Sequence, residues 1–397
     1  MNLSFNGNEL YKGFNLVTSI VPSSAIKHVL QGIRFEVRDV ETGLKPVCTL
    51  TATDLEVLVK YTLSAKEKSS PRENGDVGDA VETGFKPVSA FVLPAVRVNN
   101  ILREWAGNEE VMVSFDGSGC ILKSGKGRFR IAGEDSSQFP VIPVADVKGF
   151  VEVDGGIIGD MIGKVIHAAS TMRARSTLCG VFVEIKTSRE PGRTDGEIVM
   201  AAADGNRLSM VKRKVENPGG VSMSGIATVK CLTFLQRFPS ESKGSLRVGI
   251  GESQILFMGE RGEVVSQLID GQYPKYEDVI PKDNDKRVEV KRDELITVVR
   301  MASFMTSEGY HVVKFVFKDG RLTLMSKAAE VGEAELEIDA SYKGPDFEIC
   351  FNPEYVLDAL KVSDSETVVM ELKDNSSAAL FRTGHEQLSV IMPIELK

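Results

Sequence analysis

The sequence predicts an α+β fold in which one unit, two helices packed on antiparallel sheets, occurs three times. Apolar residues at helical spacing (i, i+3, i+4, i+7) occur twice in each third of the 397-residue chain. Short segments that alternate apolar and polar residues flank these helices and indicate strands. Each third also closes on β-branched residues and a proline, at 141–143, 279–281 and 390–393.

A first helix opens each unit directly after a short strand. The strands are predicted at 3–5, 151–153 and 288–290, and the last two have the same sequence, Val-Glu-Val. The apolar stripes that predict the helices are Leu10, Gly13, Phe14 and Val17; Ile162, Val165, Ile166 and Ala169; and Leu295, Val298, Val299 and Ala302.

A second helix follows in each unit, and Pro353 in the last one stands in the first turn, where a missing N–H costs nothing. Strands follow these helices at 111–113, 246–248 and 368–370. Further strands, at 48–52, 180–185 and 312–317, separate the two helices of each unit. The stripes are Val98, Ile101, Leu102 and Trp105; Cys231, Phe234, Leu235 and Phe238; and Pro353, Val356, Leu357 and Leu360.

The closing prolines, and the polar stretch after each, predict domain boundaries near 144–149 and 282–286. Three domains are therefore expected, at 1–145, 146–282 and 283–397. Residues 64–83 are polar and rich in Gly, Glu, Asp, Lys and Ser, which predicts a solvated loop inserted in the first domain. A shorter loop of the same kind is predicted at 186–197.

Composition and charge exclude several classes of protein. With 42% hydrophobic and 26% charged residues, the chain does not have the composition of a disordered protein. Its 48 basic and 56 acidic residues leave a net charge of −8, so any basic surface for nucleic acid must be local. There is no apolar run long enough to span a membrane and no signal peptide pattern at the N-terminus. We therefore expect a cytoplasmic protein without a membrane partner.

No motif for catalysis or for cofactor binding stands out. The five cysteines lie far apart without a C-x-x-C pair, and the four histidines form no ligand pattern. The glycines at 117–127 fail the phosphate-loop spacing at Cys120, and those at 155–159 fall one position short of a dinucleotide fingerprint. There is no G-x-S-x-G motif either. We therefore expect no metal, no cofactor and no catalytic residue.

Five segments in order along the chain carry a resemblance to one family. They are 133–135 leading to Phe139 and Pro140, then 203–208 (Ala-Asp-Gly-Asn-Arg-Leu), 269–276 (Ile-Asp-Gly-Gln-Tyr-Pro-Lys-Tyr), 351–360 and 390–394. Together they resemble the bacterial DNA polymerase III β subunit, the sliding clamp, over the whole length. The resemblance implies three DNA-clamp domains per chain and a head-to-tail homodimeric ring.

The resemblance also implies what such a ring does. It would be a processivity factor, an accessory subunit of DNA polymerase III that tethers the polymerase to DNA without catalytic residues of its own. Its expected partners are double-stranded DNA, a second copy of itself, the polymerase III α subunit, the clamp-loader complex, and other replication and repair factors with clamp-binding peptides.

The faces of the helices opposite the apolar stripes, and the adjoining turns, would line the hole of such a ring. Contacts to phosphates are independent of base sequence and therefore permit sliding. Without the resemblance, exposed basic residues on helices are more often simply solvated. Ser24 stands where clamps often have an arginine. The DNA-contacting residues are expected to be Lys12, Arg97, Arg103, Lys164, Lys230, Arg237, Arg292 and Arg300, with Arg173 added from the family's pattern.

A pocket for partner peptides, between the middle and last domains, is also implied by the resemblance. Aliphatic walls, a flexible methionine and a few polar anchors suit a promiscuous peptide site. Alternatively, Leu178, Leu208 and Val279 are ordinary core residues. Asp278 stands where clamps commonly have a basic residue, so the peptide preference is open. The family's pocket corresponds to Arg175, Thr177, Leu178, Ala203, Gly205, Asn206, Leu208, Pro274, Val279, Asn352, Tyr355, Val390, Met392, Pro393 and Ile394.

For ring closure, the resemblance sets Phe129 and Ile131 of the first domain against Phe304 and Met305 of the last. As isolated sequence features, these residues fit a protein core equally well. Two alternatives from other classes stay open. One is a peptide-binding scaffold that does not encircle DNA, and the other is a repeat-built enzyme with its active site at a repeat interface. A monomer in sedimentation would favour the scaffold, and a single carboxylate or histidine change that abolishes turnover would favour the enzyme.

Overall fold

The computed structural model describes residues 2–38, 46–67, 89–115, 119–143, 147, 149–187, 195–238, 244–307, 309, 311–328 and 331–395. They form two compact units. The first consists of Met1–Asp146, Arg237–Val248 and Gln254–Gln267, and the second of Val147–Gln236, Gly249–Ser253 and Leu268–Lys397. Residues 68–83 of the predicted inserted loop, and 144–146 at the first predicted boundary, lie outside the described residues, whereas Ser64, Lys66 and Glu67 of that predicted loop lie in strands.

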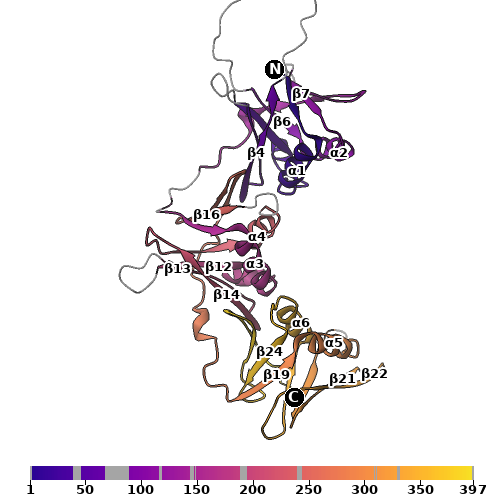
Figure 1. The fold of residues 1–397 in the computed structure, drawn as a ribbon, viewed down its shortest axis with the longest axis vertical. Coiled ribbons are helices and arrows are strands. Elements are labelled where there is room, and N and C mark those ends of the chain that lie inside the picture. Colours follow the sequence, from indigo (N-terminus) through magenta and orange to yellow (C-terminus); the bar gives the residue numbers. More distant parts are fainter. Residues whose placement is uncertain are drawn as a thin grey trace, which may run out of the picture. The chain divides into compact units, whose positions relative to one another are not determined.

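The first unit holds two neighbouring helices, α1 (Gly7–Thr18) and α2 (Ala95–Glu104), with antiparallel sheets (Figure 1). One sheet has the strand order β5-β1-β7-β8-β9, and in the other β6, β2, β3, β4 and β18 pair in succession. The strands are β1 (Asn2–Phe5), β2 (Gly32–Arg38), β3 (Val47–Thr53), β4 (Val57–Ser64), β5 (Lys66–Glu67), β6 (Ser89–Pro94), β7 (Val111–Phe115), β8 (Gly119–Ser124), β9 (Gly127–Ala132), β10 (Glu134–Asp135), β17 (Gln254–Gly259) and β18 (Gly262–Gln267). Thus β18, from the middle third of the sequence, completes a sheet of the first unit.

The second unit contains two further copies of the pattern. In the middle copy, strands β15, β12, β13 and β14 pair in succession, with helices α3 (Gly155–Val165) and α4 (Val229–Leu235). Its strands are β11 (Val151–Asp154), β12 (Gly180–Thr187), β13 (Asp195–Ala203), β14 (Arg207–Glu216) and β15 (Met223–Thr228), and β16 (Ser245–Ile250) follows α4. Short 3₁₀ segments at Ile166–Ala168, Arg173–Cys179 and Tyr276–Asp278 connect them to the surrounding chain.

In the last copy, helices α5 (Arg292–Ser303) and α6 (Pro353–Lys361) lie side by side (Figure 1). One sheet has the order β22-β21-β20-β23, and in the other β19, β24, β25 and β26 pair in succession. The strands are β19 (Lys286–Lys291), β20 (Val313–Lys318), β21 (Arg321–Ala328), β22 (Gly332–Asp339), β23 (Phe347–Phe351), β24 (Thr367–Leu372), β25 (Ala379–Gly384) and β26 (Gln387–Ile391). Strand β26 also pairs with β14, which joins the last copy to the middle one.

Side-chain caps explain where most of these helices begin. Asn6 accepts hydrogen bonds from the amides of the first turn of α1, and Asp154, Thr228 and Asn352 do the same for α3, α4 and α6. The apolar stripes of the helices pack on the sheets. In the last copy, Leu295 and Leu360 belong to one core with the fully buried Phe315.

The predicted fold class is confirmed, with local corrections. Helix α3 ends at Val165 instead of Ala169, because the next residues tighten into a 3₁₀ turn. Of the loop predicted at 186–197, residues 186–187 belong to β12 and 195–197 to β13, and residues 188–194 lie outside the described residues. No helix in the described ranges has the length and apolar character required to span a bilayer.

Candidate functional site

A tight turn between β13 and β14 lies at the centre of the predicted peptide site. One carboxylate oxygen of Asp204 accepts hydrogen bonds from the amides of Asn206 (2.8 Å) and Arg207 (3.1 Å), and Gly205 adopts φ of +97°. Such a backbone favours glycine, because a Cβ is strained there. The carbonyl of Asn206 accepts a bond from the amide of Met392 (2.8 Å), so the turn is tied to the end of β26.

Aliphatic and aromatic side chains form a small core beneath this turn. Leu208 and Val390 lie opposite each other in the β14–β26 pairing and are almost completely buried. They belong to a cluster with Tyr276. Burial raises the pKa of the Tyr276 hydroxyl, which the carboxylates of Glu184 and Glu277 raise further. Leu208 and Val390 are therefore core residues below the site, as the alternative interpretation held for Leu208.

Other predicted pocket residues reach the surface around the turn. Val279 is 50% exposed and Met392 is 39% exposed, which leaves two apolar side chains open to solvent. Arg175 donates to the carbonyl of Asp204 (2.6 Å), and its guanidinium lies directly over Gly205. The remaining predicted pocket residues are exposed or partly exposed: Thr177, Leu178, Ala203, Asn206, Pro274, Asn352, Tyr355, Pro393 and Ile394.

Arg207 was not among the predicted site residues, yet it lies at the junction of this surface. Its guanidinium donates to Asp204 (3.0 Å), to Asp358 on α6 (2.8 Å) and to the carbonyl of His167 (2.6 Å). It also lies 4.5 Å from the ring centroid of Tyr355. Burial, and then the charge of Arg207, lower the pKa of His167 to about 4. The spacing Asp204-x-x-Arg207 was the sequence signal that could have indicated the pair.

The predicted DNA-contacting residues differ in their exposure. Lys12, Arg97, Arg103, Lys230, Arg237 and Arg300 are exposed, and Arg292 is half-buried with a hydrogen bond to the carbonyl of Ser363. The side chain of Arg173 lies outside the described part of the chain. Lys164 is different, because only 4% of its side chain is exposed.

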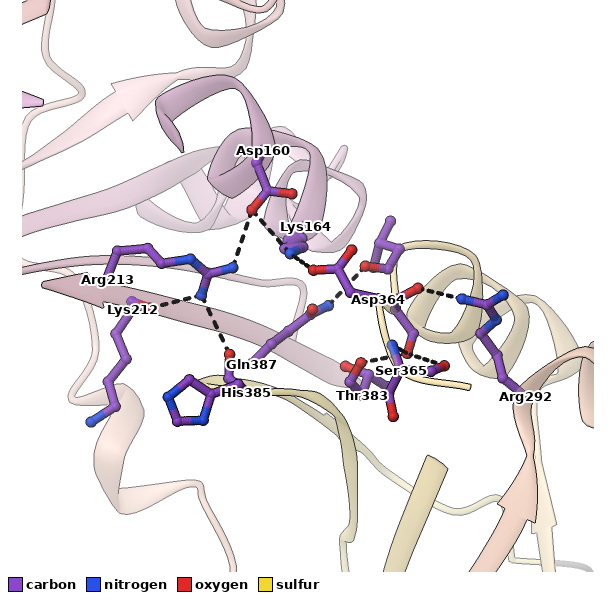
Figure 2. Close-up of polar contacts among 12 residues, drawn as sticks. Asp160, Lys164, Lys212, Arg213, Arg292, Asp364, Ser365, Thr383, His385 and Gln387 are labelled. Carbon is purple, nitrogen blue, oxygen red and sulfur yellow. Dashed lines mark hydrogen bonds and ion pairs between the residues drawn. The ribbon is translucent and has the colours of Figure 1, made fainter. Parts of the chain in front are cut away.

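The exposure expected for Lys164 is therefore wrong. Its ammonium pairs with Asp160 on the same helix (2.9 Å) and with Asp364, which follows α6 (Figure 2). Arg213 on β14 shares Asp160 (3.1 Å) and also donates to the carbonyl of His385. A lysine on a helix surface becomes buried here because a segment from the last repeat covers it.

The predicted ring-closing residues lie beside two open sheet edges. Phe129 is on β9, the edge strand of its sheet, where it is 44% exposed and contacts Trp105. Ile131 is half-buried on the same strand. Phe304, just after α5, is 69% exposed, and the sulfur of Met305 lies beside Gly332 at the start of edge strand β22.

Family models cover almost the whole chain in three consecutive pieces. They describe the DNA polymerase III beta subunit, with its N-terminal domain matching residues 1–143, its central domain 152–275 and its C-terminal domain 277–395. The "Beta sliding clamp" of Chlamydia trachomatis is 26% identical over 396 residues, which are 100% of this chain and 87% of that protein. The protein of the same name from Pseudomonas putida is 25% identical over 398 residues, 100% of both chains.

Solved structures agree with these matches. The DNA polymerase III beta subunit of Thermotoga maritima aligns with a TM-score of 0.85 and 26% identity, covering 100% of both chains. A sliding clamp of Pseudomonas aeruginosa bound to griselimycin aligns with a TM-score of 0.87 and 24% identity, again over 100% of both chains.

Proposed function

Because the chain belongs to the DNA polymerase III β subunit family, the sliding clamps, we propose that two copies close head to tail into a ring around duplex DNA. The family is a non-catalytic accessory subunit of the polymerase. In this role the ring slides without reading sequence and keeps the replicative polymerase on its template. The three predicted domains, 1–145, 146–282 and 283–397, are its building blocks.

The match between two open sheet edges carries the ring proposal. On β9, Phe129 and Ile131 share a face with the buried Leu122 and Cys120, whereas Arg128 and Arg130 point to the other face. On β22, the half-buried residues Ala334, Leu336 and Ile338 pack towards the core, and acidic residues occupy the opposite face: Glu333, Glu335, Glu337 and Asp339.

Pairing β9 of one copy with β22 of another would therefore give both the apolar face and the charged face of each strand a matching partner. The apolar sides would join two cores, and the arginines would meet the acidic row. Met305 lies beside the start of β22, with Phe304 next to it in the chain, and Phe129 packs on Trp105 beside β9. Each copy carries one edge of each kind, so the contact is heterologous, and we propose that the rotation between two copies brings the second pair of edges together and closes the ring.

The exposed basic residues of the helices and of the turn after α4 support the contact with DNA. Phosphate contacts from Lys12, Arg97, Arg103, Lys230, Arg237 and Arg300 would be independent of base sequence. Lys164 is not part of this surface, since both of its carboxylate partners lie within the chain. The weak, salt-sensitive lining that results permits sliding, because enclosure provides the retention.

Retention on DNA tests encirclement directly. The protein, placed on a closed circular duplex by its clamp loader with ATP, should stay bound in a high-salt wash and leave once the circle is cut. The variant Arg128→Glu/Arg130→Glu, with one edge reversed in charge, should not be retained on either form. Equal retention of the unmodified protein on cut and closed circles would refute encirclement and favour the peptide-binding scaffold.

The surface around Gly205, Val279 and Met392 is proposed to bind the peptides of the polymerase III α subunit, the clamp loader and other replication and repair factors. The griselimycin complex of the P. aeruginosa clamp supports a ligand site on this fold, and griselimycin therefore serves as the probe. Deletion of residues 392–397 should abolish griselimycin binding and leave the dimer intact. The deletion begins after Ile391, because Val390 and Ile391 are buried in β26. Loss of the dimer in this variant would contradict the assignment of the tail.

A further inference from the structure

Arg207 connects three segments of the second unit through one guanidinium group. Nε bonds to Asp204 in the β13–β14 turn, Nη1 to Asp358 in α6, and Nη2 to the carbonyl of His167 after α3. The plane of the group faces the ring of Tyr355. Only 14% of the Arg207 side chain is exposed, so these contacts are largely shielded from solvent. All three nitrogens of the guanidinium thus have partners within the chain.

One arm of this network determines the shape of the turn. Asp204 uses one carboxylate oxygen for the amides of Asn206 and Arg207 and the other for the Arg207 side chain. Arg207 therefore orients the carboxylate that holds Gly205 in its left-handed conformation. The turn then presents the Asn206 carbonyl to the amide of Met392, so the order extends to the end of β26.

The second arm holds α6. Tyr355 and Asp358 lie one helical turn apart on the same face of this helix. Arg207 bonds to the carboxylate of Asp358 and lies over the ring of Tyr355, so it fixes the rotamer of the ring and the position of the helix face together. Both arms end at residues of the proposed peptide site, Gly205 with Asn206 on one side and Tyr355 on the other.

We propose that Arg207 is a positioning residue of the peptide site. It holds the turn of the middle repeat and Tyr355 of the last repeat at the separation that a bound peptide needs. This inference rests on the proposed peptide-binding function. A lysine does not replace it, because its three donors leave a single nitrogen and cannot span the three positions that the planar guanidinium reaches while it stacks on the ring.

Griselimycin titration and amide hydrogen exchange test the proposal in parallel. The variants are Arg207→Met, Arg207→Lys and Asp358→Asn. The control is Arg213→Met, which removes another arginine of β14 that pairs with a carboxylate, Asp160. Arg207→Met should weaken griselimycin binding about tenfold or more, because the turn and Tyr355 lose the group that holds them in place. Arg207→Lys should recover only part of this loss, and Arg213→Met should bind as the unmodified protein does.

Exchange reports on positioning without any ligand. The amides of Asn206 and Met392, which are bonded in the turn, should exchange faster in Arg207→Met but not in Arg213→Met. Asp358→Asn should change binding and exchange in the same direction, and adding it to Arg207→Met should cause little further loss, because both act through one interaction. If Arg207→Met does not fold, griselimycin binding and amide exchange in Asp358→Asn alone test the positioning role.

The outcomes separate the two proposals. Unchanged exchange and unchanged griselimycin affinity in Arg207→Met and Asp358→Asn would overturn the positioning role. If the unmodified protein does not bind griselimycin at all, the peptide-site function fails. The exchange data then decide on Arg207 alone, with faster exchange supporting its role in ordering the turn and unchanged exchange refuting it.

Discussion

Leu55 and Gly205 occupy corresponding turns of two repeats and share a left-handed backbone, with φ of 78° and 97°. In the turn that contains Leu55, Asp54 accepts hydrogen bonds from the amides of Glu56 and Val57. In the turn that contains Gly205, Asp204 accepts them from the two corresponding amides. The carbonyl of Glu56 accepts a bond from Gln267 at 2.9 Å, which matches the bond from Met392 to Asn206 at 2.8 Å. The repeat therefore extends to individual hydrogen bonds.

Opposite substitutions at these two positions should have opposite effects. Leu55→Gly relieves the strain of a side chain at positive φ, and we expect an increase in the free energy of unfolding of up to about 1 kcal/mol. Gly205→Ala introduces that strain and places a Cβ against the Arg175 guanidinium, so we expect a loss of about 1–2 kcal/mol and weaker griselimycin binding. Urea unfolding and titration measure both, and a destabilised Leu55→Gly would contradict the argument.

Charge reversal of the two edges tests ring closure. Arg128→Glu/Arg130→Glu and Glu335→Lys/Glu337→Lys should each sediment as monomers, because their edges repel in a self-pair. An equimolar mixture of the two should recover a dimer, since a mixed ring pairs reversed with reversed and native with native. The matched control is Lys123→Glu, one strand inward on the same outer face, which should remain dimeric. Mixed variants that stay monomeric would show that other surfaces close the ring.

The buried ammonium of Lys164 should make its two acidic partners more important than the lysine itself. Asp160→Asn/Asp364→Asn leaves a buried cation unpaired, and we expect a loss of about 3–5 kcal/mol. Lys164→Met should cost less than about 1.5 kcal/mol, because it keeps the volume and leaves Asp160 paired with Arg213. Urea unfolding measures both, and the reverse order of the two losses would contradict the expectation.

His167 should make stability depend on pH in one defined window. Its pKa is lowered from 6.5 to about 4 in the folded protein, so below pH 6.5 the unfolded state takes up the proton first. Stability should therefore fall between pH 6.5 and 4, by up to about 1.4 kcal/mol per pH unit more than in His167→Gln. Above pH 6.5 the two proteins should show no difference in slope. Parallel curves over the whole range would refute the low pKa.

Local pattern was enough to predict the helices, because each apolar stripe, such as Leu295 to Ala302, packs on its own sheet. Long-range pairing was not predictable in this way. Lys164 and Arg207 looked like surface or motif residues, but besides a nearby carboxylate each pairs with a distant one, 200 and 151 positions further along the chain. The sequence of β22 does contain a usable signal. Its acidic residues alternate with apolar ones, which predicts a strand with one charged face.

The pairing of β18 with β4 and of β26 with β14 limits how this polypeptide can be dissected. A fragment that stops at residue 145 would lack β18 and leave β4 as an unpaired edge strand that is prone to aggregation. A fragment of residues 146–282 would lack β26 beside β14 and would carry β18 without its acceptor. A single repeat expressed alone would therefore need the missing partner strand added to it. Removing one repeat from the chain would likewise leave a strand of a neighbouring repeat without its partner.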